Sequence, residues 1–556
     1  MIPPDAPLAD APPRSGMAGP FRPTAPAHSR SWLWPLLGVG LLVRLAAWVW
    51  NDRLFGDVNL YALVARQWSE TGRLDYPGKF DFFDPTPYLA LSSPVSQHPP
   101  AWSWLAGLIA ALPVGLDEFA ALKLLSLLAG LAVIVLGMGL ARRLAPGQPH
   151  AATAVGVVLA LHPMLVDFSA NGSPYMGVAA GALAVAVAVV STERAWWWRG
   201  LLAGVGAGAA WNFHGAGLLL APAGLLALAL NARSAAQHPP CSEMTESFRS
   251  SAYALLLLGA YLLGLGLLLA PLFAWNQTHF GHLLHSTSTY YLQGKLGLVA
   301  LVEDAGGLHY QVRALDWTHL VPYLRLALTS AGQFLLHLGL ETGVVGLGLA
   351  ILAATTLYRR EVRQRRALLG ALGVLVAIVA PCVGWPEFKY RFLVPALPLV
   401  LILSTLGGIH LASGATRLRL TPVRALLGLT ALACLGFWLV QIALTGSPAK
   451  YYAYDREHLR DYRLMREAAA FLKARPAGLV VALPEALDGG TEAAWWHHHP
   501  TVNVRGIGAG MLHRLITDFR PAYLLLSPER RADAPPGATL SFENQGYLVY
   551  ELGTGS

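Results

Sequence analysis

The feature that most constrains this chain is a series of apolar stretches of about 20 residues, which recur through most of its length. A helix of that size crosses about 30 Å of hydrocarbon. Charged residues make up only 13% of the chain, whereas soluble domains carry about 25%. The sequence therefore predicts an α-helical polytopic membrane protein and excludes a single large soluble core.

The positive charges lie where they set the orientation of a membrane protein. The formal net charge is +8, but Lys and Arg gather in short loops between the apolar stretches. This placement follows the positive-inside pattern and disfavours a nucleic-acid partner. Arg14, Arg22 and Arg30 precede the first stretch. We therefore expect residues 1–30 to be a disordered cytoplasmic tail that leads into an uncleaved helix.

The topology depends on the apolar segment 101–112, which is too short to span the bilayer and suits an interfacial position. Arg142 and Arg143, at the end of the next full span, then face the cytoplasm together with the later basic clusters. Residues 51–100 form a large outer loop, and 319–337 an amphipathic helix on the outer surface. The predicted transmembrane helices, about eleven in number, are 32–50, 119–140, 151–167, 173–190, 199–213, 215–230, 252–274, 340–358, 366–384, 391–411 and 424–445.

The last part of the chain has a different character, because polar residues dominate from about Ala449 onward. Short apolar runs bounded by turn residues predict strands there, and Glu543-Asn544-Gln545-Gly546 reads as a hairpin turn. The predicted elements are a helix to Leu472, strands at 479–483, 523–526, 540–542 and 547–550, and a helix at 510–519. We therefore predict a transmembrane domain over 31–448 and a small periplasmic α/β domain over 449–556.

The outer loop 51–100 holds the sharpest group of candidate residues. Asp57 is followed by Tyr61 at helical spacing, and the loop closes on His98 before two prolines. An acid just outside the bilayer lies where a lipid carrier presents its headgroup, and its carboxylate could accept a proton from a hydroxyl group. Alternatively, Asp57 could simply cap the helix that follows it. Spacing alone leaves both readings open.

The order of several motifs resembles the GT-C glycosyltransferases, in the branch that contains protein O-mannosyltransferases and lipid A aminoarabinose transferases. The motifs that carry the resemblance are Asp57 with Tyr61 and Ala65, His98-Pro99-Pro100, Ala141-Arg142-Arg143-Leu144, Leu161-His162-Pro163, and the run from Lys389 to Pro398. The resemblance covers roughly residues 32–411. It implies the GT-C fold, a polyprenyl-phosphate sugar donor and Asp57 as the catalytic base.

The chain departs from the pattern of that family at two places. A second acid usually follows the third span, but here Asp167 lies several residues early and Asn171 or Tyr175 stands in the expected region. Asp167 is therefore a candidate second catalytic residue or a solvated helix end. His214 stands where the family commonly has a basic residue, and an imidazole could contact a phosphate.

Lys389 and Arg391 sit at the outer end of a predicted span. They could clamp the carrier phosphate and stabilise the leaving group, or they could extend to the interface beside aromatic residues. The predicted substrate-binding residues are Tyr61, His98, His214, Lys389 and Arg391. No motif indicates a metal site or another cofactor, since the His497–His499 tract lacks ligand spacing, and a divalent cation at the acids stays open.

The sequence thus predicts a glycosyltransferase of the bacterial inner membrane, with a cytoplasmic N-terminus and a periplasmic C-terminus. Its expected partners are membrane lipids, a polyprenyl-phosphate sugar donor, and a lipid, glycan or protein acceptor on the outer face. A glycan polymerase or ligase would place arginines in a large late outer loop. A transporter would show internal repeats and interrupted helices, which we do not find in the sequence. A relative that only binds glycan stays open.

Overall fold

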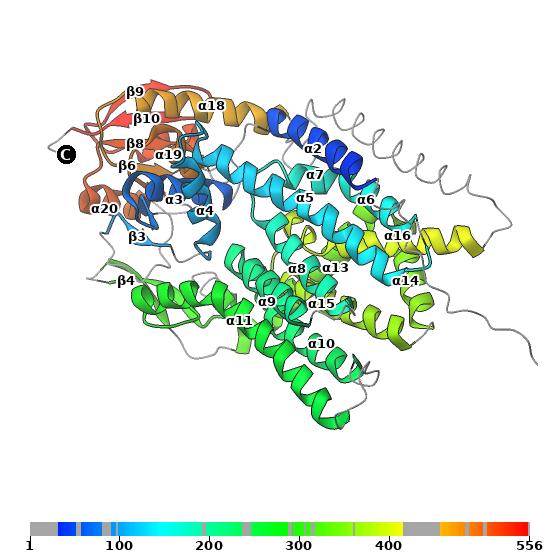
Figure 1. Cartoon of the computed structure of the whole chain (residues 1–556). Coiled ribbons are helices and arrows are strands. Elements are labelled where there is room, and N and C mark those ends of the chain that lie inside the picture. The colour runs from blue at the N-terminus through cyan, green and yellow to red at the C-terminus, as the bar shows by residue number, and fades with distance from the viewer. Residues whose placement is uncertain are drawn as a thin grey trace, which may run out of the picture.

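The computed structural model describes residues 32–51, 57–79, 90–95, 98–148, 150–191, 196–235, 246–286, 292–293, 295–304, 307–312, 317–359, 362–414, 456–483, 489–503 and 509–553. The predicted tail 1–30 and the predicted span 424–445 lie outside the described residues. The first described part, up to residue 414, is mainly helical, and the last part, from residue 456, is a mixture of helices and strands (Figure 1).

The helices of the first part are α2 (Leu33–Trp50), α3 (Asp57–Thr71), α4 (Ala101–Ala110), α5 (Glu118–Leu144), α6 (Ala151–Leu161), α7 (Pro163–Phe168), α8 (Tyr175–Val190), α9 (Trp196–Phe213), α10 (Leu220–Ala235), α11 (Glu246–Phe280), α13 (Leu320–Thr342), α14 (Val344–Tyr358), α15 (Val362–Gly384) and α16 (Leu397–Gly414). Short 3₁₀ turns are η1 (Gly215–Gly217), η2 (Trp317–His319) and η3 (Tyr390–Leu393). Two antiparallel strand pairs lie between the helices: β1 (Asp75–Tyr76) with β3 (Ser93–Pro94), and β4 (Val299–Asp304) with β5 (Gly307–Val312).

Among the described residues, four helices are long and apolar enough to cross a membrane: α2, α5, the 254–280 part of α11 and the 364–384 part of α15. A fifth span arises if α13 and α14, which meet at a bend of 93°, count as one. The predicted surface helix 319–337 is longer than expected and ends at Thr342, where Gly343 takes a φ of 73°. The other apolar helices are shorter, so the count of about eleven spans stays a prediction.

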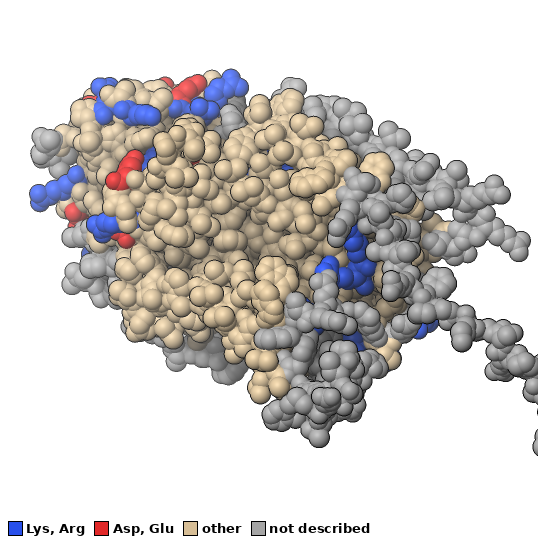
Figure 2. Space-filling view, viewed as in Figure 1, with Lys and Arg blue, Asp and Glu red and all other residues tan. Residues whose placement is uncertain are grey.

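The charged residues mark the two ends of the molecule. On the face shown in Figure 2, Lys, Arg, Asp and Glu gather at the end formed by the C-terminal elements. Among the described residues, Lys and Arg appear at the opposite end, and a broad band with almost no charge lies between the two ends. This distribution agrees with helices that cross a bilayer and with basic residues on one side of it.

Close helix packing in the first part depends on small residues. The sequence is rich in Gly and Ala between 200 and 217, which predicts close approach of helices there. A methyl group on Gly204 would meet the backbone of α11 at the Tyr261 carbonyl oxygen, and one on Gly181 would meet the Gly206 carbonyl oxygen at 2.5 Å. The contacts of α9 with α8 and α11 therefore require glycine at these positions.

Arg44 lies inside α2 and is fully buried. A charge at this depth needs protein partners, and the break between α6 and α7 supplies them. The guanidinium donates hydrogen bonds to the carbonyl oxygens of Ala160 at 2.9 Å and Leu159 at 3.1 Å, and to Ser169 Oγ at 3.1 Å. Because carbonyl groups at the end of α6 have no partner within their own helix, Arg44 stabilises this break.

The last part of the chain builds a six-stranded sheet in the order β2-β7-β6-β8-β10-β9. Its elements are α18 (Arg456–Lys473), β6 (Val480–Leu483), α19 (Gly489–His497), β7 (Thr501–Asn503), α20 (Ala509–Phe519), β8 (Tyr523–Leu526), η4 (Pro528–Asp533), β9 (Thr539–Glu543) and β10 (Leu548–Glu551). Alternate residues of β6 face opposite sides: Val480 packs in the cluster that contains α18, and Val481 in the one that contains α20. Helices thus cover both faces of the sheet.

The sheet contains elements that the sequence prediction missed. The predicted strands and the helix at 510–519 are present, but α19 and β7 are additional. The sixth strand, β2 (Gly78–Lys79), comes from the segment after α3 and pairs in parallel with β7. The loop after α3 is therefore part of the C-terminal sheet, and Figure 1 shows α3 and α4 beside the C-terminal elements.

Candidate active site

The helix α3 presents the predicted catalytic residue at its first position. Asp57 and Tyr61 are four residues apart, so they lie on the same face of the helix, one turn from each other. A carboxylate in the first turn also interacts favourably with the helix dipole. Tyr61 is buried, and the Asp57 side chain is 16% exposed.

Arg391 meets Asp57 although 334 residues separate them in the chain. The arginine lies in η3, where the chain turns before α16. One nitrogen of its guanidinium, Nη2, is 3.1 Å from Asp57 Oδ2 and 3.4 Å from Oδ1. The turn before α16 therefore places a cation beside the acid at the start of α3.

Two histidines from different elements complete the surroundings of the acid. His98 Nε2 is 3.8 Å from Asp57 Oδ2, and the His98 ring lies 5.3 Å from that of Tyr61. The ring of His214, which precedes η1, is 5.1 Å from that of His98. We call Asp57, Tyr61, His98, His214 and Arg391 the acid cluster.

The hydrogen bonds of His214 fix which of its nitrogens carries the proton. The backbone N–H of Ala216 donates to His214 Nδ1 at 3.1 Å, so Nδ1 must hold a lone pair. The neutral ring therefore carries its proton on Nε2. This nitrogen is 3.1 Å from the hydroxyl of Tyr175 and donates to it. Tyr175, the first residue of α8, thus joins the acid cluster through His214.

The charges in the cluster favour an ionised Asp57. Burial by itself would raise the pKa of the Asp57 carboxyl, but the guanidinium of Arg391 beside it holds the pKa below its ordinary value. Burial lowers the pKa of His98, although the neighbouring Asp57 acts in the opposite direction. The cluster at neutral pH is therefore a carboxylate paired with a guanidinium beside neutral imidazoles.

Five of the predicted site residues form the acid cluster, and the other two, Lys389 and Asp167, are not among its members. Lys389 extends to Glu387, with its Nζ 3.4 Å from the carboxylate, and 43% of its side chain is exposed. Asp167 is buried in α7, and it is not one of the three possible ligand groups that gather at Asp57. Tyr175 is the cluster neighbour that the predicted set lacks. Its only sequence signal was its place in the region where the family has a second acid.

The sequence left open whether a divalent cation binds at the acids, and the geometry of the acid cluster bears on this question. Asp57, His98 and His214 each offer one ligand atom, and these atoms lie within 4.8 Å of one another. Histidine and carboxylate are common zinc ligands. However, His214 Nδ1 accepts a backbone hydrogen bond and Nε2 carries the proton, so neither nitrogen offers a free lone pair. Because Arg391 also pairs with the carboxylate, the trio does not fit a metal.

We therefore expect Asp57 to make no contribution to metal binding. Wild type and Asp57→Asn, each equilibrated with Zn²⁺ or Mn²⁺ and then desalted, should retain equal amounts of metal by inductively coupled plasma mass spectrometry. One equivalent of metal held by the wild type and lost in the variant would contradict this prediction.

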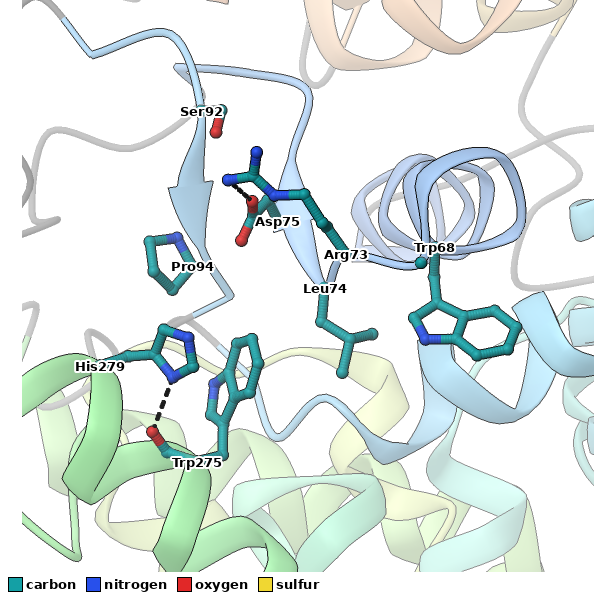
Figure 3. Close-up of a pocket in the computed structure, with 9 residues that line it drawn as sticks. Trp68, Arg73, Leu74, Asp75, Ser92, Pro94, Trp275 and His279 are labelled. Carbon is teal, nitrogen blue, oxygen red and sulfur yellow. Dashed lines mark hydrogen bonds and ion pairs between the residues drawn. The ribbon is translucent and has the colours of Figure 1, made fainter.

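A separate pocket lies at the other end of α3 (Figure 3). Its volume is about 310 Å³, and it lies between the β1–β3 pair and the C-terminal end of α11. Trp68 and Trp275 face it, and Arg73 and Asp75 form an ion pair of 2.6 Å at its edge. Trp68 follows Asp57 by eleven residues, which is about 16 Å along a helix. The pocket is therefore distinct from the acid cluster.

Comparison with known proteins agrees with this architecture. Residues 97–242 match the family model described as dolichyl-phosphate-mannose-protein mannosyltransferase. No curated protein sequence matches the chain. ArnT from Cupriavidus metallidurans bound to undecaprenyl phosphate has a TM-score of 0.59 and 16% identity, over 94% of this chain and 98% of ArnT.

The archaeal oligosaccharyltransferase AglB from Archaeoglobus fulgidus, in complex with an inhibitory peptide and a dolichol-phosphate, has a TM-score of 0.51 and 14% identity. That match covers 94% of this chain and 74% of AglB. These structures are GT-C glycosyltransferases, so the resemblance predicted from the order of motifs is confirmed. The chain is a membrane protein with the fold of the GT-C glycosyltransferases, and part of its sequence matches their mannosyltransferase branch.

Proposed function

We propose that this protein transfers a sugar from a polyprenyl-phosphate donor to an acceptor hydroxyl at the outer face of the bacterial inner membrane. The observation that carries the proposal is the Asp57–Arg391 pair, which places a carboxylate and a guanidinium 3.1 Å apart in the acid cluster. A base for the acceptor and a cation for the phosphate are the two groups that such a transfer needs. The GT-C fold and the undecaprenyl phosphate bound by ArnT support this reading.

In this proposal Asp57 accepts the proton of the acceptor hydroxyl. The acceptor oxygen forms a bond to the anomeric carbon as the bond between that carbon and the phosphate oxygen breaks. The carrier then leaves as a phosphate, whose new charge Arg391 stabilises. Attack from the side opposite to the leaving phosphate inverts the anomeric configuration.

Donor binding should change the charge around Asp57, because the donor phosphate and the Asp57 carboxylate both pair with Arg391. Without the donor, the guanidinium lowers the basicity of the carboxylate. A donor phosphate competes for the same guanidinium, because arginine forms strong paired hydrogen bonds with phosphate oxygens. Its negative charge also favours protonation of the nearby carboxylate. Donor binding therefore makes Asp57 a stronger base at the step where a base is required.

Tyr61 and His98 are the proposed contacts to the sugar or its phosphate. The Tyr61 hydroxyl and His98 Nε2 are buried, and neither makes a hydrogen bond within the described chain. Buried polar groups in proteins are nearly always hydrogen-bonded, so two such atoms side by side support a polar ligand. His214 would act through Tyr175. Contributions of Lys389 and Asp167, like the cytoplasmic N-terminus and periplasmic C-terminus, stay predictions.

The direct test is release of free polyprenyl phosphate. Purified protein in lipid nanodiscs is incubated with a series of undecaprenyl-phosphate monosaccharides and an extract of envelope lipids and glycans, and the products are separated by liquid chromatography and mass spectrometry. We expect release of undecaprenyl phosphate with at least one donor, together with a sugar-modified acceptor. Transfer from nucleotide sugars alone would contradict the proposal.

A further inference from the structure

The helix that carries Asp57 lies between the acid cluster and the C-terminal elements. Arg66 follows Asp57 by nine residues, which places it about 180° around the helix from the acid. The side of α3 opposite Asp57 therefore faces other neighbours. Those neighbours are α5 and, from the last part of the chain, α19, and Figure 1 shows α19 beside α3 and α4.

Arg66 joins α3 to both neighbours. Its Nη1 donates a hydrogen bond of 2.7 Å to the carbonyl oxygen of Trp495, in the last turn of α19. Its guanidinium also lies 4.8 Å from the centre of the Trp495 ring. On α5, Glu118 is 3.7 Å from Arg66 Nε and accepts a hydrogen bond of 3.0 Å from Ser69 Oγ. A cation at the C-terminal end of α19 also interacts favourably with its helix dipole.

The Trp495 side chain packs in the same apolar cluster as the residues next to the acid. It is 5% exposed, and its ring meets that of Phe119 edge to face at 6.3 Å. The cluster includes Val58 and Tyr61 of α3, together with Trp102 of α4. Removing this indole would open a cavity beneath the first turns of α3, and neighbours of a buried cavity relax only in part.

The chain that follows α3 has a second attachment to the C-terminal elements. Gly78 pairs with Thr501 and Lys79 with Val502, where β2 extends the sheet beside β7. The helix α3 is thus attached to the C-terminal elements at two places: through the Arg66 side chain, and through β2, which follows the helix in the chain. Both attachments belong to the chain beyond residue 456, which contributes no residue to the acid cluster among those described.

We propose that the C-terminal elements position Asp57 for catalysis, and that Arg66 and Trp495 are the positioning residues. This inference rests on the proposed function, and it gives the C-terminal elements a role in the catalytic step. Displacement of a reacting group by about 1 Å can cost about 100-fold in rate. A helix held on one side only is free to make such a shift.

The experiment compares Trp495→Ala and Arg66→Gln with wild type and with Arg514→Ala as a matched control. Arg514 forms an ion pair with Asp518 within α20, which packs on the face of the sheet opposite to α18 and α19. We expect both test variants to lower kcat for release of undecaprenyl phosphate about 10- to 100-fold. The donor KM should stay unchanged, because Arg391 and the cluster histidines are intact. Arg66→Lys should recover part of the lost rate.

Hydrogen exchange supplies a measurement that does not depend on activity. Peptides that cover residues 57–71 should exchange faster in Trp495→Ala and Arg66→Gln than in wild type, and Arg514→Ala should match wild type. If the wild type transfers no sugar from any polyprenyl-phosphate donor, the proposed function fails, and exchange still tests the attachment. Unchanged exchange in 57–71, an unchanged kcat, or an effect on KM alone would overturn the inference. Arg66→Gln covers the case in which Trp495→Ala does not fold.

Discussion

Asp57→Asn should reduce the rate of sugar transfer at least about 100-fold, since loss of a general base typically costs about 10²–10⁴ in rate. Asparagine keeps the size of the side chain and can still cap a helix, but it lacks the charge and the basicity of the carboxylate. Release of undecaprenyl phosphate by variant and wild type in nanodiscs gives the rate. Binding of donor should persist, because Arg391 no longer has a competing carboxylate.

The matched control for this variant is Asp117→Asn. Asp117 caps α5 by accepting a hydrogen bond of 2.7 Å from the Ala120 N–H, and it is not part of the acid cluster. Asparagine also caps helices well, so this substitution should leave both folding and transfer unchanged. Near-normal turnover in Asp57→Asn, with equal amounts of inserted protein, would mean that Asp57 is only a helix cap.

Arg391→Gln should lower kcat about 10²–10³-fold, which is the usual effect of removing one group that stabilises charge in a transition state. Glutamine can donate a hydrogen bond but carries no charge, so both the leaving phosphate and the ionised Asp57 lose their cation. The donor KM should rise as well, since the same guanidinium contacts the bound phosphate. Steady-state kinetics with the active donor separates the two effects.

Lys389→Gln provides the comparison for Arg391→Gln. Lys389 is two residues away, is 43% exposed and pairs with Glu387 rather than with Asp57. Exposed ion pairs contribute about 0–1 kcal/mol to the free energy of folding, so the variant should fold normally. Because Lys389 does not pair with Asp57, this substitution should change the rate much less than Arg391→Gln does. Equal losses in the two variants would show that general positive charge, and not the guanidinium beside Asp57, supports transfer.

Sequence reasoning located the acid cluster because its members lie in motifs with a readable order. Asp57 and Tyr61 share a helix face by simple periodicity, and this part of the site follows from spacing alone. The meeting of Asp57 with Arg391 across 334 residues does not follow from spacing. The resemblance to a family suggested a role for each residue separately, and the structure shows that the two residues pair.

The elements that sequence reasoning missed are those defined by their partners. β2 has two residues and β7 has three, and so short a run has no periodicity to recognise. They become strands because a neighbouring strand satisfies their backbone groups. Tyr175 was missed as a cluster member for a related reason. Only the fold shows that its hydroxyl lies 3.1 Å from His214 Nε2.

The pairing of β2 with β7 joins a segment that is synthesised early to a segment that is synthesised late. About 420 residues separate the two strands. At about 5–20 residues per second, β2 leaves the ribosome on the order of 20–80 s before its partner strand β7 is synthesised. During that interval the side of α3 that later meets Trp495 has no cover from the C-terminal elements. A chain whose translation stops before Thr501 therefore lacks the partner strand of β2, and this side of α3 stays uncovered.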